Sequence, residues 1–114
     1  MSAKGRPERE QAPKRGARRL VGGRTMAEAS PADWLAIQRL FIRYATSLDH
    51  GDVEAVVGCY TADCVLESPV LGTFTGHAGL RDFAGRTARL LREEGAQFRH
   101  VVSNLVADVD GDTA

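Results

Sequence analysis

The sequence predicts a small α+β domain that begins near residue 29 and follows a basic leader. In three segments of the later part, apolar residues recur at helical spacing, and two further segments have the composition of strands. The dipeptide Asp110-Gly111 is typical of the turn that joins two strands of a hairpin. Because this turn comes shortly before residue 114, we expect the sheet to be incomplete in this chain.

The leader, residues 1–28, differs in charge from the rest of the chain. Eight Lys or Arg and two Glu give its first 25 residues a charge of +6, and the remainder carries −6, so the net charge of zero hides two different parts. With scattered Gly and Pro and no apolar periodicity, the leader cannot bury enough surface to offset its ordering entropy. We therefore expect residues 1–28 to be disordered.

Two functions are open for this leader. Its charge suits weak contact with nucleic acid or anionic lipid, but no aromatic residue interleaves the charges to stack on bases. The favoured alternative is a solvated leader without a task, or upstream sequence with Met26 as the working start. The apolar runs of a secretory signal and of a membrane span are both missing, so we expect a cytoplasmic protein with no membrane or nucleic-acid partner.

The domain is expected to open with a helix. Ser30 suits the N-cap, Pro31 the first helical position and Asp33 the positive end of the helix dipole. One face then carries an apolar stripe at helical spacing: Trp34, Ile37, Phe41, Tyr44 and Leu48.

Shorter elements follow. The segment Asp52–Gly58 predicts a brief helix capped by its aspartate, and Cys64–Ser68 predicts a strand that ends at a proline. The spacing Gly72-x3-Gly76 indicates a turn, and a third helix is expected from about His77 to Glu94.

The last predicted element is a long strand from Gln97 to Val109. Its β-branched residues and its alternation favour an extended chain in which both faces are substantially apolar, so it needs helices on one side and strands or a partner subunit on the other. One face is expected to hold Phe98, His100, Val102, Asn104 and Val106.

Four motifs in this order resemble the SnoaL-like branch of the nuclear-transport-factor-2-like superfamily, which includes polyketide cyclases, scytalone dehydratase and ketosteroid isomerase. The resemblance covers residues 30–114 and is carried by Tyr44-x4-Asp49-x2-Asp52, Tyr60-x-Ala-Asp63, Gly72-x3-Gly76 and Arg99-His100-x3-Asn104.

The resemblance implies a cone-like curved sheet packed against three N-terminal helices around an apolar pocket, and commonly a homodimer. It also implies further strands after the long strand, and we expect these to be missing from this chain. In the dehydratases of the superfamily, an Asp after the first helix and a His on the long strand form an acid/base pair, with a Tyr on that helix. By motif position these residues correspond to Asp49, His100 and Tyr44.

The chemistry itself explains why these residue types suit the task. A β-elimination beside a carbonyl needs a base to take a proton from carbon and an acid to protonate the leaving hydroxyl, and imidazole can do both. A carboxylate orients the ring, and a phenol can donate to the developing enolate. No metal or organic cofactor is needed, and the lone pair of cysteines, Cys59 and Cys64, has no accompanying metal-ligand set.

The geometry imposes one condition on this assignment. In a continuous helix Asp49 would be rotated about 140° from Tyr44, so we expect the helix to end near Leu48. Each residue also has a structural alternative. Asp49 can serve as a turn carboxylate, His100 as a hydrogen-bonded core histidine, and Tyr44 as a packing residue.

The first hypothesis is a cofactor-independent lyase or isomerase that acts on a small apolar hydroxylated ring or polyketide-like compound. Asn104 would bind substrate or satisfy an edge backbone group, and the pocket walls would be Trp34, Phe41, Phe98 and Val102. The alternatives are a non-catalytic ligand-binding or dimerisation module of the same fold, and an inactive fragment.

Overall fold

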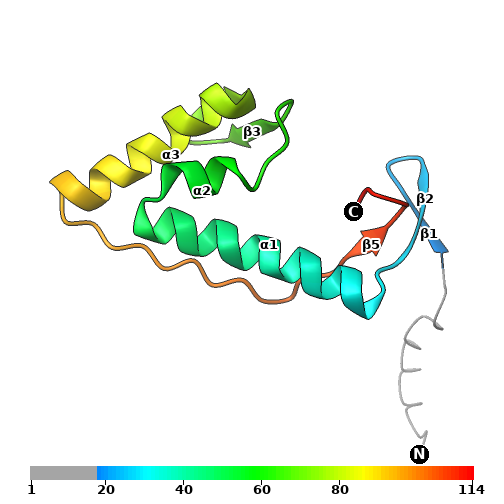
Figure 1. Cartoon of the computed structure of the whole chain (residues 1–114). Helices are drawn as coiled ribbons and strands as arrows, with labels where there is room; N and C mark the ends of the chain where they lie inside the picture. Colours follow the sequence, from blue (N-terminus) through cyan, green and yellow to red (C-terminus); the bar gives the residue numbers. More distant parts are fainter. Residues whose placement is uncertain (1–17) are drawn as a thin grey trace, which may run out of the picture.

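A computed structural model of the protein describes residues 18–114. The order of elements is two strands, two helices, two strands, a third helix and a short last strand. The strands form two separate antiparallel sheets, one of three strands and one of two, so the described part does not contain a single curved sheet (Figure 1). The α+β class predicted from the sequence is confirmed.

The described chain opens with a hairpin of β1 (Arg18–Val21) and β2 (Arg24–Glu28). Gly22 and Gly23 join the strands with φ values of 55° and 78°, and such positive values at both central positions are typical of the tight turn of a hairpin. This finding corrects the expectation of disorder for residues 18–28. That expectation rests on composition, whereas two adjacent glycines favour a hairpin turn. Residues 1–17 of the leader lie outside the described residues.

Helix α1 (Pro31–His50) begins as predicted and ends later than predicted. At its start, the side chain of Ser30 accepts a hydrogen bond from the backbone N–H of Asp33. At its end, Gly51 adopts the left-handed conformation with φ 74° and donates to the carbonyl of Leu48. The next N–H along the chain donates to the carbonyl five residues back, which completes a Schellman motif. Since this motif places its glycine directly after the helix, α1 continues to His50, and the expected end near Leu48 is wrong.

The middle of the chain folds largely as predicted. Helix α2 (Val53–Val57) is capped by the Asp52 side chain, and the strand predicted over Cys64–Ser68 appears as β3 (Val65–Ser68). The turn predicted at Gly72-x3-Gly76 is instead a second strand, β4 (Gly72–Thr75), which pairs with β3 between two glycines of positive φ. The predicted third helix is confirmed as α3 (Gly76–Glu93).

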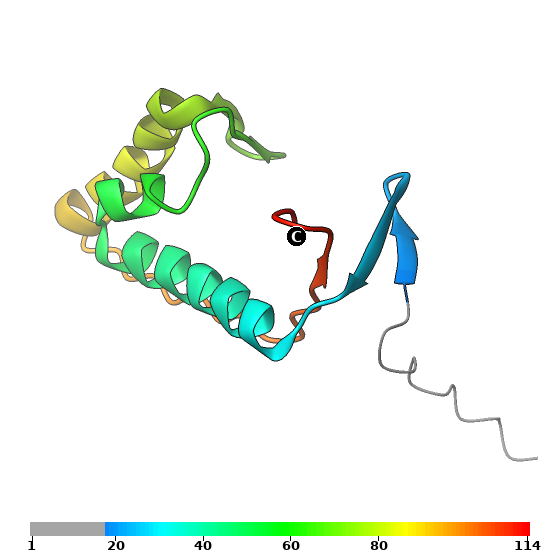
Figure 2. The same cartoon turned by 45° about the vertical axis from the view of Figure 1, so that its right-hand side comes forward.

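The core lies where α2 and α3 meet the C-terminal half of α1, and β4 packs on α3. Leu80 and Val56 are completely buried there, and Phe74 of β4 packs against Phe83 of α3 with ring centroids 5.4 Å apart. In Figures 1 and 2 the hairpin of β1 and β2 lies with β5 (Asp108–Val109) at the opposite end of α1 from α3. One end of α1 therefore belongs to the helical core and the other to the three-stranded sheet.

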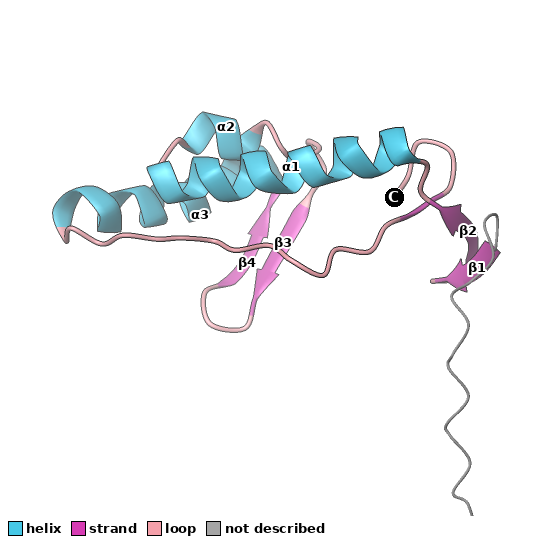
Figure 3. Ribbon diagram, turned by 90° about the horizontal axis from the view of Figure 1, so that it is seen from below, coloured by secondary structure: helices cyan, strands magenta, loops and turns pink. Residues whose placement is uncertain are grey.

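The chain returns from α3 to β5 through residues 95–107, which we call the return segment. Figures 1 and 3 show it running alongside α1 from one end to the other. The long strand predicted over Gln97–Val109 is wrong for most of this length, because only Asp108 and Val109 pair with a strand, β2. A strand needs a hydrogen-bonded neighbour as well as the right side chains, and in the described part of the chain α1 lies alongside the segment.

The expected alternation of faces breaks at Asn104. This residue has φ 46°, in the left-handed region that Asn tolerates better than most residues. Before it, Val102 is less exposed than Val101, whereas after it Val106 is 75% exposed and Leu105 is half-buried. The left-handed residue thus shifts the pattern by one position, and Val106 does not share the face of His100.

Candidate active site

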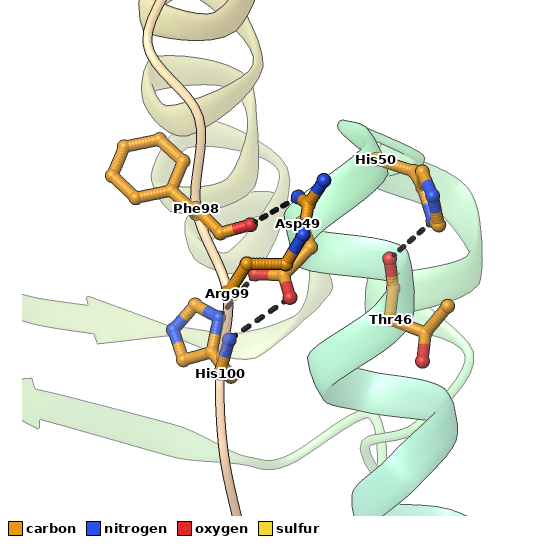
Figure 4. A network of polar contacts seen from close by, with 6 residues as sticks. All are labelled: Thr46, Asp49, His50, Phe98, Arg99 and His100. Atoms are coloured by element: carbon orange, nitrogen blue, oxygen red, sulfur yellow. Dashed lines mark hydrogen bonds and ion pairs between the residues drawn. The ribbon is translucent and has the colours of Figure 1, made fainter.

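The structure brings together two of the predicted catalytic residues, Asp49 and His100. Asp49 lies in the last turn of α1, and His100 lies on the return segment, 51 positions later in the sequence. The imidazole Nδ1 is 2.5 Å from one carboxylate oxygen, Oδ1, and the backbone N–H of His100 donates to the other, Oδ2, at 2.9 Å (Figure 4). His100 therefore binds both oxygens of the Asp49 carboxylate.

This arrangement fixes the proton on the ring. An ionised carboxylate only accepts hydrogen bonds, so Nδ1 carries a proton and donates a hydrogen bond to Asp49. Whenever the ring is neutral, the second nitrogen, Nε2, keeps its lone pair. The side chain of His100 is 41% exposed and that of Asp49 only 10%, so the accessible partner is the one that can exchange a proton with a ligand.

The charge state of Asp49 follows from its surroundings. Burial opposes ionisation of this carboxyl group, but the backbone and ring hydrogen bonds of His100 act in the other direction. Together with the positive charges of His100 and Arg99, these bonds hold the pKa of Asp49 below its usual value. The carboxylate is consequently ionised at neutral pH and suited to orient a neighbouring imidazole.

Tyr44, the third predicted catalytic residue, belongs to a different face of α1. Because the helix continues through Asp49, the two side chains leave it about 140° apart. Tyr44 instead packs against the buried core cluster and meets Tyr60 edge to face, with ring centroids 5.8 Å apart. The structure therefore does not join Tyr44 to the Asp49 and His100 pair.

Tyr60 is the residue that sequence reasoning did not consider for the site. Burial raises the pKa of its phenol above the usual range, and the neighbouring Tyr44 adds to this shift. A phenol in this state stays protonated and keeps its ability to donate a hydrogen bond. Tyr60 was visible in the sequence as part of the Tyr60-x-Ala-Asp63 motif, but nothing local indicates that it pairs with Tyr44.

The predicted wall residues are spread along the molecule. Phe98 is half-buried and lies two residues from His100, on the same stretch of chain beside Asp49 (Figure 4). Trp34 is about 22 Å from Asp49 along the axis of α1, and Phe41 about 12 Å, at 1.5 Å per residue. Of the predicted wall residues on α1, only Phe41 is within two to three turns of the pair. On the return segment, Val102 is 48% exposed and Asn104 is exposed.

The other two histidines bind backbone carbonyls. His50 contacts the carbonyl of Thr46 through Nδ1 at 2.9 Å, and His77 contacts that of Tyr60 through Nε2 at 2.9 Å. Within residues 18–114, no group of three or more His, Cys, Asp or Glu side chains is arranged to hold a metal ion. In the same residues, no helix has the length and apolar character needed to cross a membrane.

Comparison with known proteins gives one match. The family model of the SnoaL-like domain matches residues 30–114, which is the part of the chain that carries the four sequence motifs. No curated protein and no solved structure matches the chain.

Proposed function

The chain belongs to the SnoaL-like family, and from this premise we propose that it acts as a cofactor-independent lyase or isomerase of the dehydratase type. The substrate would be a small, largely apolar hydroxylated ring or polyketide-like compound. The observation that supports the proposal is the double hydrogen bond between the Asp49 carboxylate and His100. The family resemblance implies a cone-like apolar hollow, and the pair would lie at its wall.

In the proposed reaction His100 moves one proton from carbon to oxygen. Nε2 takes the proton from the carbon next to a carbonyl, and the Asp49 carboxylate stabilises the imidazolium that results. The imidazolium then protonates the hydroxyl on the neighbouring carbon, the carbon–oxygen bond breaks, and water leaves. The ring ends in its starting protonation state, so no external acid or reductant is consumed. In an isomerisation, the same proton would return to a different carbon.

A phenol is proposed to stabilise the enolate that forms between the two steps. Tyr44 was assigned this task by its motif position, and the structure places Tyr60 beside it. Either phenol can donate a hydrogen bond to a developing negative oxygen. In the described arrangement, these two phenols lie on the opposite side of α1 from Asp49. A substrate would contact a phenol and the Asp49 and His100 pair together only by lying across the end of the helix.

The proposal is tested by turnover with a panel of hydroxylated ring ketones, followed by the ultraviolet absorbance of the conjugated product. His100→Ala should lower kcat by about 10²- to 10⁴-fold, the usual contribution of a positioned acid/base group. Asp49→Asn should also lower it, because an amide that donates to Nδ1 leaves the proton on Nε2, where the base is needed. His50→Ala removes an exposed imidazole next to Asp49 and should leave kcat unchanged. Equal loss in the His50 and His100 variants would refute the proposal.

A second candidate is a non-catalytic ligand-binding or dimerisation module. It is favoured by the apolar side chains that α1 and the return segment leave exposed, among them Phe41, Ile42 and Val101. Under this alternative His100→Ala would change ligand affinity without a loss of turnover, and Ile42→Glu would lower the mass measured by sedimentation equilibrium. Homodimer formation and a cytoplasmic location belong to the first proposal as well.

A further inference from the structure

The return segment is attached to the rest of the molecule at few points. At one end the N–H of Ala96 donates to the carbonyl of Leu90, and at the other the carbonyl of Ala107 accepts from Ala29, both at 3.2 Å. Between residues 97 and 106, the two bonds from His100 to Asp49 are the only hydrogen bonds that join the segment to another part of the described chain.

Apolar packing contributes to this attachment at Phe98 and Leu105, which are half-buried, and contributes little at the valines. Val101 is 89% exposed, Val106 is 75% exposed and Val102 is 48% exposed, although all three have the composition of a buried strand. The hydrophobic contribution to stability scales with the apolar area removed from water, so these side chains hold the segment only weakly. Asp49 is the contrasting group, because its side chain is 10% exposed and both of its oxygens bind His100 of the return segment.

The two hydrogen bonds to Asp49 differ in one respect that matters. The bond to Oδ1 comes from the imidazole and depends on the side chain at position 100. The bond to Oδ2 comes from the backbone N–H and exists with any residue there except proline. The carboxylate thus binds the chain itself as well as the ring.

We propose that Asp49 is a positioning residue that fixes the return segment on α1 through the backbone N–H of His100. The orientation of the imidazole is a second effect of the same carboxylate. The attachment of residues 97–106 therefore depends on position 49 far more than on the side chain at position 100. This inference holds whether or not the pair is catalytic, since it concerns where the chain lies.

The test is amide hydrogen exchange, measured residue by residue on the full 114-residue chain. Asp49→Ala should raise the exchange rate of the amide at position 100 by about fivefold or more, as expected when this N–H loses its hydrogen bond to a charged group. The amides of α3 should be unchanged and report that the core is intact. Asp82→Ala, which removes an exposed carboxylate paired with Arg86 within α3, is the matched control and should not affect the segment.

Two further variants separate the backbone bond from the ring bond. His100→Ala loses the ring but keeps the N–H, so the amide at position 100 should stay protected at close to the rate of the unmodified protein. Asp49→Asn keeps one carbonyl oxygen that can accept this N–H and should behave in the same way.

Three results would overturn the inference. The first is unchanged exchange of the amide at position 100 in Asp49→Ala while α3 stays protected. The second is loss of protection in His100→Ala as large as in Asp49→Ala. If Asp49→Ala exposes the amides of α3 as well, that variant reports unfolding of the core. The inference is then tested by the amide at position 100 in His100→Ala alone, and loss of protection of this amide is the third result.

Discussion

Gly79 of α3 lies directly against Phe74 of β4. A Cβ atom added at Gly79 would come within 2.9 Å of the carbonyl carbon of Phe74 and 3.2 Å of its Cα, which is closer than side chains pack. The absence of a side chain is what lets the helix approach the backbone of the strand this closely. The contact joins the two-stranded sheet to the helical core.

We therefore predict that Gly79→Ala destabilises the protein by about 1–3 kcal/mol, the usual cost of forcing extra atoms into a packed site. Gly85 provides the control within the same helix, because an added Cβ would meet nothing within 4 Å there. Gly85→Ala should stabilise the protein by up to about 1 kcal/mol through helix propensity. Urea unfolding measures both, and equal effects of the two substitutions would contradict the close approach.

Leu80→Ala should cost about 2–5 kcal/mol, because a fully buried leucine is replaced by a smaller side chain that leaves a cavity. Leu90 lies in the same helix but is 39% exposed, so Leu90→Ala should cost much less. Thermal unfolding followed by circular dichroism compares the two. Similar melting temperatures for both variants would show that the core does not centre on Leu80.

Gly51→Ala should destabilise the protein by roughly 1–2 kcal/mol, the cost of a Cβ in the left-handed conformation. The new Cβ would also lie 3.2 Å from Leu91 Cδ1 and 3.4 Å from Ala88 Cβ of α3. Asn tolerates this conformation better than Ala, but its larger side chain meets the same neighbours, so Gly51→Asn should not recover the full stability. Urea unfolding in which Gly51→Ala matches the unmodified protein would contradict the Schellman end of α1.

The lowered pKa of Asp49 predicts a pH dependence of stability with a definite sign. A carboxyl group whose pKa is lower in the folded state than its ordinary value of 3.8 stabilises the fold fully above that value. The stabilisation is lost as the pH falls through the lowered folded-state pKa. The free energy of unfolding should therefore differ between the unmodified protein and Asp49→Asn at pH 7, and this difference should shrink as the pH is lowered below about 4.

Urea unfolding at a series of pH values from 7 to 2.5 tests this prediction. Asp63→Asn, which changes an exposed carboxyl in the loop before β3, serves as the control and should leave the pH dependence of stability nearly unaltered. A gap between Asp49→Asn and the unmodified protein that stays constant over the whole range would show that His100 does not bind the carboxylate in its ionised form.

Several elements follow from residues that are close together in the sequence. Ser30, Pro31 and Asp33 determine where α1 begins, and Asp52 determines where α2 begins. Each of these signals works through a hydrogen bond or a backbone angle within a few residues, so a reading of the local sequence is sufficient. Family membership also followed from the sequence, since the family model matches the same residues that carry the motifs.

The errors arose where a local pattern depends on distant partners. The composition of Gln97–Val109 favours a strand, but a strand forms only where another strand offers hydrogen bonds, and most of this segment lies along α1. The end of α1 was misplaced for a related reason. The expected end near Leu48 followed from the condition that Asp49 face the side of Tyr44, whereas the left-handed Gly51 ends the helix at His50.

The sequence alone determined which residue types the candidate site contains and on which kinds of element most of them lie. The family resemblance implied that Asp49 pairs with His100. Only the tertiary structure decided that His100 binds both carboxylate oxygens, and that Tyr44 leaves α1 toward Tyr60 instead. The physical reason is that the direction of a helical side chain changes by about 100° per residue. One or two residues more or less at the end of a helix therefore decide which neighbours a side chain can reach.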